Sequence, residues 1–360
     1  MKKIILYIFL CSITTLLVLN PQESIFYAKE GINLCLDIII PSLFPFFICS
    51  GLLVYSGFCE VLARLFNPIM KPLFNINPTG ASAFVLGIVS GYPIGAATAC
   101  ELYNSLYISK SEAERLLAFC NNSGPLFILG AVGVSMYHSV RVGVILYVCH
   151  ILGAITVGIL FKNYKKDTFC APRAKIETRE QNISLIFSEV LKNSIQNILI
   201  VCGTVIFMSV ITNVLLDIAS FNSVFSTLFL SLSEFVSGLK SVSSLNLDIF
   251  YKLLLSAWIC AFAGISVHLQ VMGVVSKTGL SLKPYILGKI FHGFISLFYT
   301  FIALKILPYK EPCISVFNQS QKYNFSFFTS SLYQIIAVFV IFIFIFLLSF
   351  NKKKRHREIF

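Results

Sequence analysis

The chain has 360 residues, of which 57% are hydrophobic and 12% charged, and its formal net charge is +12. Soluble domains carry about 25% charged residues, so this composition excludes a single soluble domain. Several apolar runs approach the ~20 residues that span a bilayer as a helix, which predicts an all-α polytopic membrane protein embedded in lipid. The basic residues gather in short loops and at the termini, as in membrane proteins with cytoplasmic positive charge, so we expect no nucleic-acid partner. The 11 cysteines stand singly without a C-x-x-C pair, and we therefore expect no metal, no cofactor and no disulfide framework.

The N-terminal stretch, residues 1–22, is basic at its start and apolar from Ile4 to Leu19, as in a signal peptide or a first transmembrane helix. No small-residue cleavage pair precedes Gln22, which favours an uncleaved helix. Gly31 to Gly57 is long enough to cross next, but it carries two central prolines. Each proline removes a backbone hydrogen bond, so this helix is either a kinked packing helix or part of a functional site.

Cys59 to Phe74 is amphipathic, with Arg64 and Lys71 available to lipid headgroups. Its apolar side consists of Leu62, Leu65, Phe66, Ile69, Met70 and Leu73. This pattern predicts an interfacial helix on the cytoplasmic face.

The stretch from Phe84 to Phe127 is apolar but interrupted twice. Two arms, Ala81–Ser90 and Ala96–Tyr107, are joined by Ser-Gly-Tyr-Pro-Ile-Gly, which predicts a helical hairpin. The second interruption, Asn121–Pro125, lies inside the helical run Ala113–Tyr137. Unpaired backbone groups are tolerated at membrane depth only where they are buried in protein or line a wet cavity. We therefore expect both breaks to border a cavity, as the discontinuous helices of secondary transporters do.

The remaining segments repeat this order. After a spanning helix and a basic cytoplasmic linker, a long helix leads into a second hairpin centred on Leu232–Leu239, a helix with polar residues in its middle, and two further spans. The corresponding segments are Val140–Phe161, the linker 162–182, Ile183–Asp217, Ser223–Val242, Phe250–Val275, Tyr285–Leu307 and the C-terminal span 332–351 with its basic tail.

Residues 31–161 and 183–307 therefore form two repeats, each with a span, a hairpin, a broken span and a span. Ala118–Leu126 can be laid over Ala261–Leu269, and Ser90-Gly91 over Ser237-Gly238. If each hairpin is re-entrant, the repeats have inverted topology and both termini are cytoplasmic. Most of the 28 Lys and Arg residues then lie on the cytoplasmic side.

Acidic residues inside membrane segments are functional candidates by default. Glu101 and Glu234 lie in or beside the two hairpins, where each would bind a coupling proton or cation or hold its hairpin closed. The alternative for Glu101 is a position among the lipid headgroups.

Asn121, Asn122 and Ser123 offer amide and hydroxyl groups beside the break at Gly124, which suits a neutral ring, a carboxylate or an ion. The alternative is that they hydrogen-bond to one another between helices. His268 and Gln270 occupy the related position in the second repeat, where a lone histidine on an apolar helix is more often a packing residue.

Gly87, Gly91 and Gly95 lie four residues apart in and beside the first hairpin, which suits either close helix packing or the approach of a ligand to the backbone. No Walker motif, H-E-x-x-H motif or Ser-His-Asp grouping is present in the sequence, so we do not expect an enzyme.

Ser90–Ala96 and Phe119–Phe127 together resemble the YlbJ family of sporulation integral membrane proteins. That family belongs to the gate, or nucleoside-recognition, superfamily and shares its core with concentrative nucleoside transporters. The resemblance covers nearly the whole chain. It implies expression in the sporulating mother cell and a multi-pass location in the outer forespore membrane. It also implies transport of dipicolinic acid, a small anionic substrate, toward the developing spore.

The resemblance and the two breaks together select substrate-binding candidates: Ser90, Gly91, Tyr92, Pro93, Gly95, Asn121, Asn122, Ser123, Gly124, Glu234, Ser237, Gly238, Ser266 and His268. Arg115 and Lys240 are the basic side chains expected to reach the cavity. The first hairpin tip has no carboxylate, unlike those of nucleoside transporters, which argues against nucleosides as cargo. The alternatives are a structural protein of the forespore envelope needed for cortex formation, or a nucleoside-type carrier. The sequence leaves open whether chains form a homo-oligomer.

Overall fold

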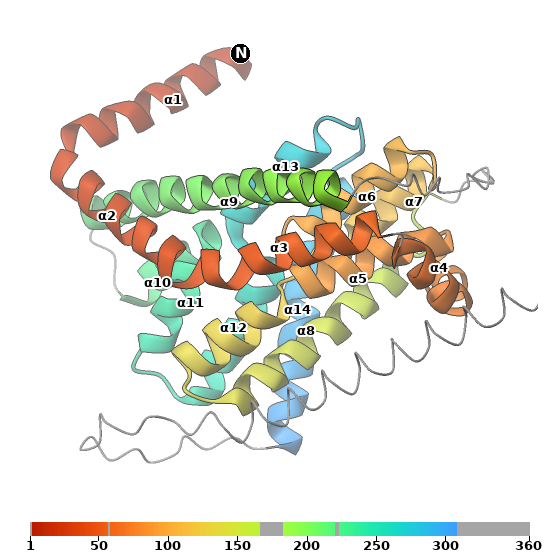
Figure 1. The fold of residues 1–360 in the computed structure, drawn as a ribbon. Helices are drawn as coiled ribbons and strands as arrows, with labels where there is room; N and C mark the ends of the chain where they lie inside the picture. Colours follow the sequence, from red (N-terminus) through yellow and green to blue (C-terminus); the bar gives the residue numbers. More distant parts are fainter. Residues whose placement is uncertain (1, 57, 166–182, 220–222, 308–360) are drawn as a thin grey trace, which may run out of the picture. The chain divides into compact units, whose positions relative to one another are not determined.

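The computed structural model describes residues 2–56, 58–165, 183–219 and 223–307, and within these ranges all regular structure is helical (Figure 1). Five of the described helical segments are long and apolar enough to cross a membrane: Pro21–Leu53, Val140–Phe161, Ser184–Ile218, Ile249–Val275 and Lys283–Ile306. The prediction of an all-α membrane protein is confirmed. The C-terminal span 332–351 and most of the linker 162–182 lie outside the described residues.

The first half begins with α1 (Lys2–Leu19), α2 (Pro21–Leu34), a π-helical turn (Cys35–Ile39) and α3 (Ile40–Tyr55). The second helix thus starts at Pro21, not at Gly31 as predicted. Proline in the first turn and Glu23 beside it are favourable helix-start signals that outweigh the polarity of this segment. The π turn lies directly before Pro41, so the predicted irregularity takes the form of a widened turn within a continuous helix.

An amphipathic helix, α4 (Phe58–Ile69), and a π turn (Met70–Phe74) follow, as Cys59–Phe74 predicts, and a 3-10 turn (Pro78–Gly80) leads into the first hairpin. The hairpin consists of α5 (Ala81–Ser90) and α6 (Ile94–Asn104), close to the predicted arms. The interrupted helix is α7 (Lys110–Leu117) followed, after a non-helical stretch, by the π-helical segment η4 (Leu126–Met136). The span α8 (Val140–Phe161) has the predicted bounds.

The second half repeats this order. It consists of the long helix α9 (Ile183–Ala219), a hairpin of α10 (Ser223–Ser233) and α11 (Phe235–Ser244), the interrupted pair α12 (Ile249–Phe262) and α13 (Gly264–Val275), and α14 (Lys283–Ile306). The predicted lead-in before Ile195 is continuous with the span in α9. The second hairpin turns at Glu234, within the predicted tip.

The helix contacts of the two halves correspond. Helix α6 packs on α13, and its counterpart α11 packs on η4. Helix α7 packs on α14, and its counterpart α12 packs on α8. The long helices α3 and α9 pack against each other, as do α8 and α14 (Figure 1). The interrupted helix of each half therefore packs on the last helix of the other half, which brings residues distant in sequence to a common centre.

Apolar side chains face outward along the predicted spans. The exposed ones include Val144 and Leu152 on α8, Leu199 and Phe207 on α9, and Phe294 on α14. Polar side chains are buried in between, among them Asn121, Asn122, Glu234, Lys289 and His292. Apolar outer faces with a polar interior suit a protein surrounded by lipid.

Candidate functional site

The first helix break, residues 118–125, is enclosed by glycines. A Cβ at Gly87 or at Gly95 would overlap the carbonyl oxygen of Cys120, and a Cβ at Gly288 on α14 would overlap that of Ala118. Gly87 and Gly95 are therefore explained by close backbone packing. Because the break is wedged between the hairpin and α14, its free carbonyls lie inside the protein.

Each hairpin tip rests on the break of its own half. Gly91 ends α5 with φ 83°, a conformation that favours glycine, and a Cβ there would lie 3.0 Å from the backbone nitrogen of Gly124. In the second half Ala263 and Gly264 have φ 77° and 70°. A Cβ at Gly264 would lie 3.2 Å from the Leu232 carbonyl oxygen. The tips and breaks thus form two backbone-to-backbone contacts of the same kind.

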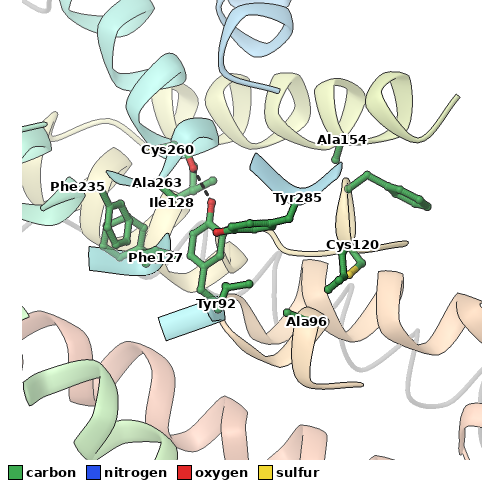
Figure 2. Close-up of a cluster of buried hydrophobic side chains, with 14 of the residues drawn as sticks. Tyr92, Ala96, Cys120, Phe127, Ile128, Ala154, Phe235, Cys260, Ala263 and Tyr285 are labelled. Carbon is green, nitrogen blue, oxygen red and sulfur yellow. Dashed lines mark hydrogen bonds between the residues drawn. The ribbon is translucent and has the colours of Figure 1, made fainter. Parts of the chain in front are cut away.

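The two halves meet at Tyr92. Its hydroxyl donates to the carbonyl of Cys260 at 2.9 Å, and its ring packs edge-on against Phe235 with centroids 6.0 Å apart. Ser123 also donates to Cys260, at 3.4 Å. Cys260 lies in the last turn of α12, where helix carbonyls lack intrahelical partners. Figure 2 shows Tyr92 pointing from the first hairpin toward Cys260, with Tyr285 beside it.

Lys289 of α14 lies in this centre and is 1% exposed. Its ammonium donates to the Tyr92 hydroxyl and to the Asn121 carbonyl, both at 3.1 Å, and lies 3.5 Å from His292 Nδ1. His292 Nε2 donates to the His150 carbonyl at 2.8 Å, because a carbonyl oxygen only accepts. In the neutral ring Nδ1 is then the acceptor that faces Lys289.

The sequence analysis missed this lysine. It expected Arg115 and Lys240 to be the basic side chains near the break, but Arg115 is bound to backbone carbonyls elsewhere and Lys240 borders a separate cavity. The signal that would have found Lys289 is an ionisable residue within a candidate span, followed one turn later by a histidine.

Several buried polar atoms around the centre make no hydrogen bond of ordinary geometry within the described structure. They include the Ser90 hydroxyl, both polar atoms of the Asn121 amide, Asn122 Oδ1 and His150 Nδ1. Buried polar groups are normally paired, and each exception needs an explanation. Asn122 Nδ2, in contrast, donates to the Phe119 carbonyl at 2.9 Å, and His150 Nε2 accepts from the Ser123 amide at 3.2 Å.

The contacts of Glu234 and Gly238 in the second hairpin are made within the hairpin itself. Glu234 is fully buried and caps α11, accepting from Val236 N at 3.1 Å and from Ser237 N at 2.7 Å. A Cβ at Gly238 would overlap Ser231 on the other arm. The described residues therefore assign Glu234 and Gly238 clear roles within the hairpin, and a ligand role for them stays a prediction.

Ser266 and His268 lie on α13, beside the residues that form the centre. The Ser266 hydroxyl is buried without a hydrogen bond. His268 Nδ1 is 2.9 Å from the Tyr285 hydroxyl, and Tyr285 lies in the same buried cluster as Tyr92 (Figure 2). His268 therefore reaches the centre through Tyr285.

Cavities border the hairpins. One of about 780 Å³ is lined by Pro93 at the first tip and by Gln196, Asn197, Thr204, Gln270 and Lys277. A second, about 360 Å³, lies beside Glu101 on α6 and shares Gln196 and Asn197 with the first. A third, about 410 Å³, is lined by Ser237 and Lys240 on α11. Pockets for small ligands are commonly about 300–1,000 Å³, so the first tip separates a ligand-sized cavity from the buried centre.

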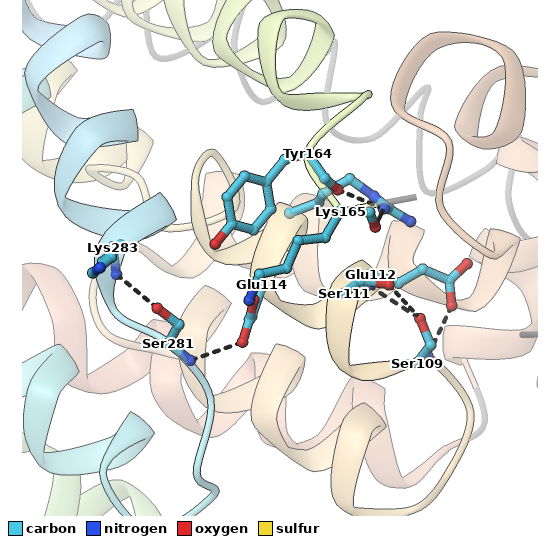
Figure 3. A network of polar contacts seen from close by, with 9 residues as sticks. Ser109, Ser111, Glu112, Glu114, Tyr164, Lys165, Ser281 and Lys283 are labelled. Carbon is cyan, nitrogen blue, oxygen red and sulfur yellow. Dashed lines mark hydrogen bonds and ion pairs between the residues drawn. The ribbon is translucent and has the colours of Figure 1, made fainter. Parts of the chain in front are cut away.

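Charged residues anchor α7 outside this centre. Glu114 is fully buried and accepts from Lys165 Nζ at 2.9 Å and from Ser281 N at 3.0 Å (Figure 3). The Glu114 carboxylate raises the pKa of the Lys165 ammonium above its ordinary value. The ion pair therefore persists through the neutral pH range and is lost only as the pH rises through that raised value. Arg115 donates to the carbonyls of Tyr164, Lys165 and Asn75, each at 2.8 Å.

Replacing Arg115 by lysine is expected to destabilise the protein by about 2 kcal/mol, because an ammonium cannot serve three carbonyls that a guanidinium fork reaches. Thermal unfolding of the purified variant in detergent would measure this loss. Lys110→Gln, at an exposed position of the same helix, serves as the control and should unfold like the unchanged protein. Equal unfolding temperatures for Arg115→Lys and the control would contradict the anchoring role.

Comparison with known proteins identifies relatives of this chain. The Gate family, described as nucleoside recognition, matches residues 37–188, from the π turn after α2 to the start of α9. The sporulation integral membrane protein YlbJ of Bacillus subtilis (strain 168) is 29% identical, over 90% of this chain and 86% of the relative. No solved structure matches the chain. The chain is therefore similar to a sporulation integral membrane protein of the YlbJ type over most of its length, and its residues 37–188 match the Gate family, in line with the resemblance seen in its sequence.

Proposed function

We propose that this chain is a secondary transporter of the sporulating mother cell, which moves dipicolinate across the outer forespore membrane. The observation that carries the proposal is the meeting of two hairpin tips and two helix breaks at one buried polar centre around Tyr92. Discontinuous helices that meet inside a membrane protein are how secondary transporters build substrate sites. The Gate domain and the sporulation relative point the same way.

The exchange of contacts between halves supports an inverted repeat with re-entrant hairpins. In that arrangement the termini are cytoplasmic, and the tips approach the midplane from opposite faces. Gating would consist of one tip leaving its break while the other stays closed. The first tip is suited to this, because it separates the cavity at Pro93 from the buried centre.

The chemistry of the centre favours an anion with oxygen acceptors. The Asn121 amide nitrogen and the Ser90 hydroxyl are donors without a hydrogen bond of ordinary geometry, and Lys289, when protonated, supplies positive charge. A pyridine ring with two carboxylates can take such donors and stack on aromatic side chains. A nucleoside-type cargo or a purely structural role in the forespore envelope are the alternatives that the following experiment separates.

Uptake of labelled dipicolinate into proteoliposomes tests the function. The unchanged protein should show saturable uptake that uridine does not inhibit. Asn121→Ala should reduce that uptake at least tenfold, because it removes the unpartnered amide while its backbone carbonyl can still accept from Lys289. Asn104→Ala, at an exposed position near the end of α6, is the matched control and should transport normally.

Folded protein that takes up no dipicolinate under any ion gradient would contradict the proposal and favour the structural role. Uptake that uridine blocks would favour a nucleoside-type carrier instead. Folding is checked in each case by the unfolding temperature of the purified sample.

A further inference from the structure

Lys289 is a buried amine that no described carboxylate contacts. Lysine is almost never fully buried unless it is paired, yet this side chain is 1% exposed in the middle of the hairpin and break contacts. Its neighbours within hydrogen-bond distance are a hydroxyl, a backbone carbonyl and an imidazole nitrogen. Among the residues that the structure describes, it forms no ion pair.

Other residues around Lys289 do not supply the missing negative charge. The rings of His150 and His292 lie tilted against each other with centroids 4.5 Å apart, and an imidazole can add only positive charge. The Tyr92 ring centroid lies 4.9 Å from Lys289 Nζ, which is a favourable cation–π distance but supplies no neutralising charge. Glu234, the buried acid of the second tip, caps α11 with both of its carboxylate oxygens. With Lys289 protonated, the described centre therefore carries a positive charge that no described carboxylate balances.

Two buried donors lie on the segments that contact Lys289. The carbonyl of Asn121 accepts from Lys289, and the amide nitrogen of the same residue, which faces the Tyr285 hydroxyl, makes no hydrogen bond of ordinary geometry. The Ser90 hydroxyl, on the hairpin arm that leads to Tyr92, is likewise buried and unpartnered. A carboxylate has two oxygens that accept several hydrogen bonds and carries the compensating charge. A neutral cargo offers the acceptors without the charge.

We propose that Lys289 is the specificity-determining residue of the site and selects a carboxylate-bearing anion over a neutral cargo of the same shape. This inference rests on the proposed function and names the group that enforces its substrate class. A carboxylate that entered between Lys289 and the Asn121 amide would accept the hydrogen bond that Lys289 now donates to the Tyr92 hydroxyl. The neutral hydroxyl would thus be replaced by a charged acceptor.

Access to Lys289 follows from the position of the first tip. Pro93 lines the cavity of about 780 Å³, and Tyr92, the preceding residue, binds Lys289 on the buried side. A cargo in the cavity is therefore separated from Lys289 by the tip itself. When Lys289 binds a carboxylate in place of the Tyr92 hydroxyl, the tip loses one of its contacts with α14. Recognition of the anion is thereby coupled to movement of the hairpin.

Binding to purified protein in detergent tests the inference with two ligands of one shape, dipicolinate and its neutral diamide. The unchanged protein should bind dipicolinate at least tenfold more tightly than the diamide. Lys289→Gln should weaken dipicolinate binding at least tenfold and leave binding of the diamide within about twofold, whereas Lys289→Arg should keep most of the preference. Lys283→Gln, an exposed lysine of the same helix, should behave like the unchanged protein.

Equal weakening of both ligands by Lys289→Gln, or no weakening of either, would overturn the inference and leave Lys289 a structural residue. Should that variant not fold, the unchanged protein still decides, because equal affinity for dipicolinate and the diamide excludes selection by charge. Dipicolinate uptake without any preference over the diamide refutes the inference alone. Folded protein that neither binds nor transports dipicolinate refutes the proposed function as well.

Discussion

Replacing Gly95 by alanine is expected to destabilise the protein by at least about 3 kcal/mol, at the upper end of the usual cost of overpacking. The added Cβ would overlap the Cys120 carbonyl oxygen, which also lies against Gly87 on the other arm of the hairpin. Backbone atoms wedged between two helices cannot turn away as a flexible side chain would. The first break would have to move away from the hairpin, and the hydrogen bond from Lys289 to the Asn121 carbonyl would be lost. Thermal unfolding in detergent and the yield of monodisperse protein measure this effect.

A second glycine provides the control for this prediction. Gly203 of α9 has no atom within 4 Å of a built Cβ. Gly203→Ala should be neutral or stabilising by up to about 1 kcal/mol, because alanine loses less backbone entropy in a helix. If Gly95→Ala unfolds at the same temperature as Gly203→Ala, the break is not clamped between the hairpin and α14 as described.

Local signals were sufficient to predict the helices around the centre. Glycine and proline mark the first tip between Ser90 and Gly95, and asparagines with Gly124-Pro125 mark the first break. Such residues act on the few residues beside them, so their effect can be deduced without knowing the fold. The second break has a weaker local signal, because only Gly264 marks it and the other left-handed residue is Ala263. The repeat overlay predicts its approximate position, but the contact between Gly264 and the second tip is visible only in the fold.

The basic centre could not be deduced in the same way. Lys289, His292 and His150 come from α14 and α8 and meet Tyr92 through packing between the two halves. Lys289 lies only six residues after the start of α14, a distance that in a sequence suggests the lipid headgroups. Its burial arises because the break packs on Gly288, the residue directly before it. The site residues Ser90, Tyr92 and Asn121 are therefore predictable as a polar break, but the charge that sets their ligand class is not.

The two breaks also explain why polar residues gather where they do. A helix that stops inside the protein leaves carbonyls without partners, here those of Asn121 and Cys260. Lys289 and Tyr92 satisfy these two carbonyls and bind each other. The cost of interrupting two helices is thus offset by contacts that join the first hairpin, α12 and α14. Movement of the first tip would expose these carbonyls together, which makes the centre respond as one unit.

Replacing Glu234 by alanine is expected to destabilise the protein by about 3 kcal/mol. The carboxylate caps α11 through Val236 N and Ser237 N at full burial. Losing an N-cap costs about 0.5–2 kcal/mol, and a buried donor left without an acceptor costs about 1–3 kcal/mol. The second tip also holds Phe235 against Tyr92 and Phe127, so dipicolinate uptake should fall with the loss of the tip. Thermal unfolding and uptake are measured on the same sample.

Two further variants separate capping from a role in ion coupling. Aspartate is a favoured N-cap, so Glu234→Asp should recover most of the stability and most of the uptake. Glu234→Ser keeps a capping oxygen without a carboxylate, and if capping is the whole role, it should transport in proportion to its folded fraction. A serine variant that is as stable as the unchanged protein but transports nothing would show instead that the carboxylate itself takes part in transport. In that case Glu234 would be a coupling residue, and its hydrogen bonds to Val236 N and Ser237 N would describe the state in which it does not hold an ion.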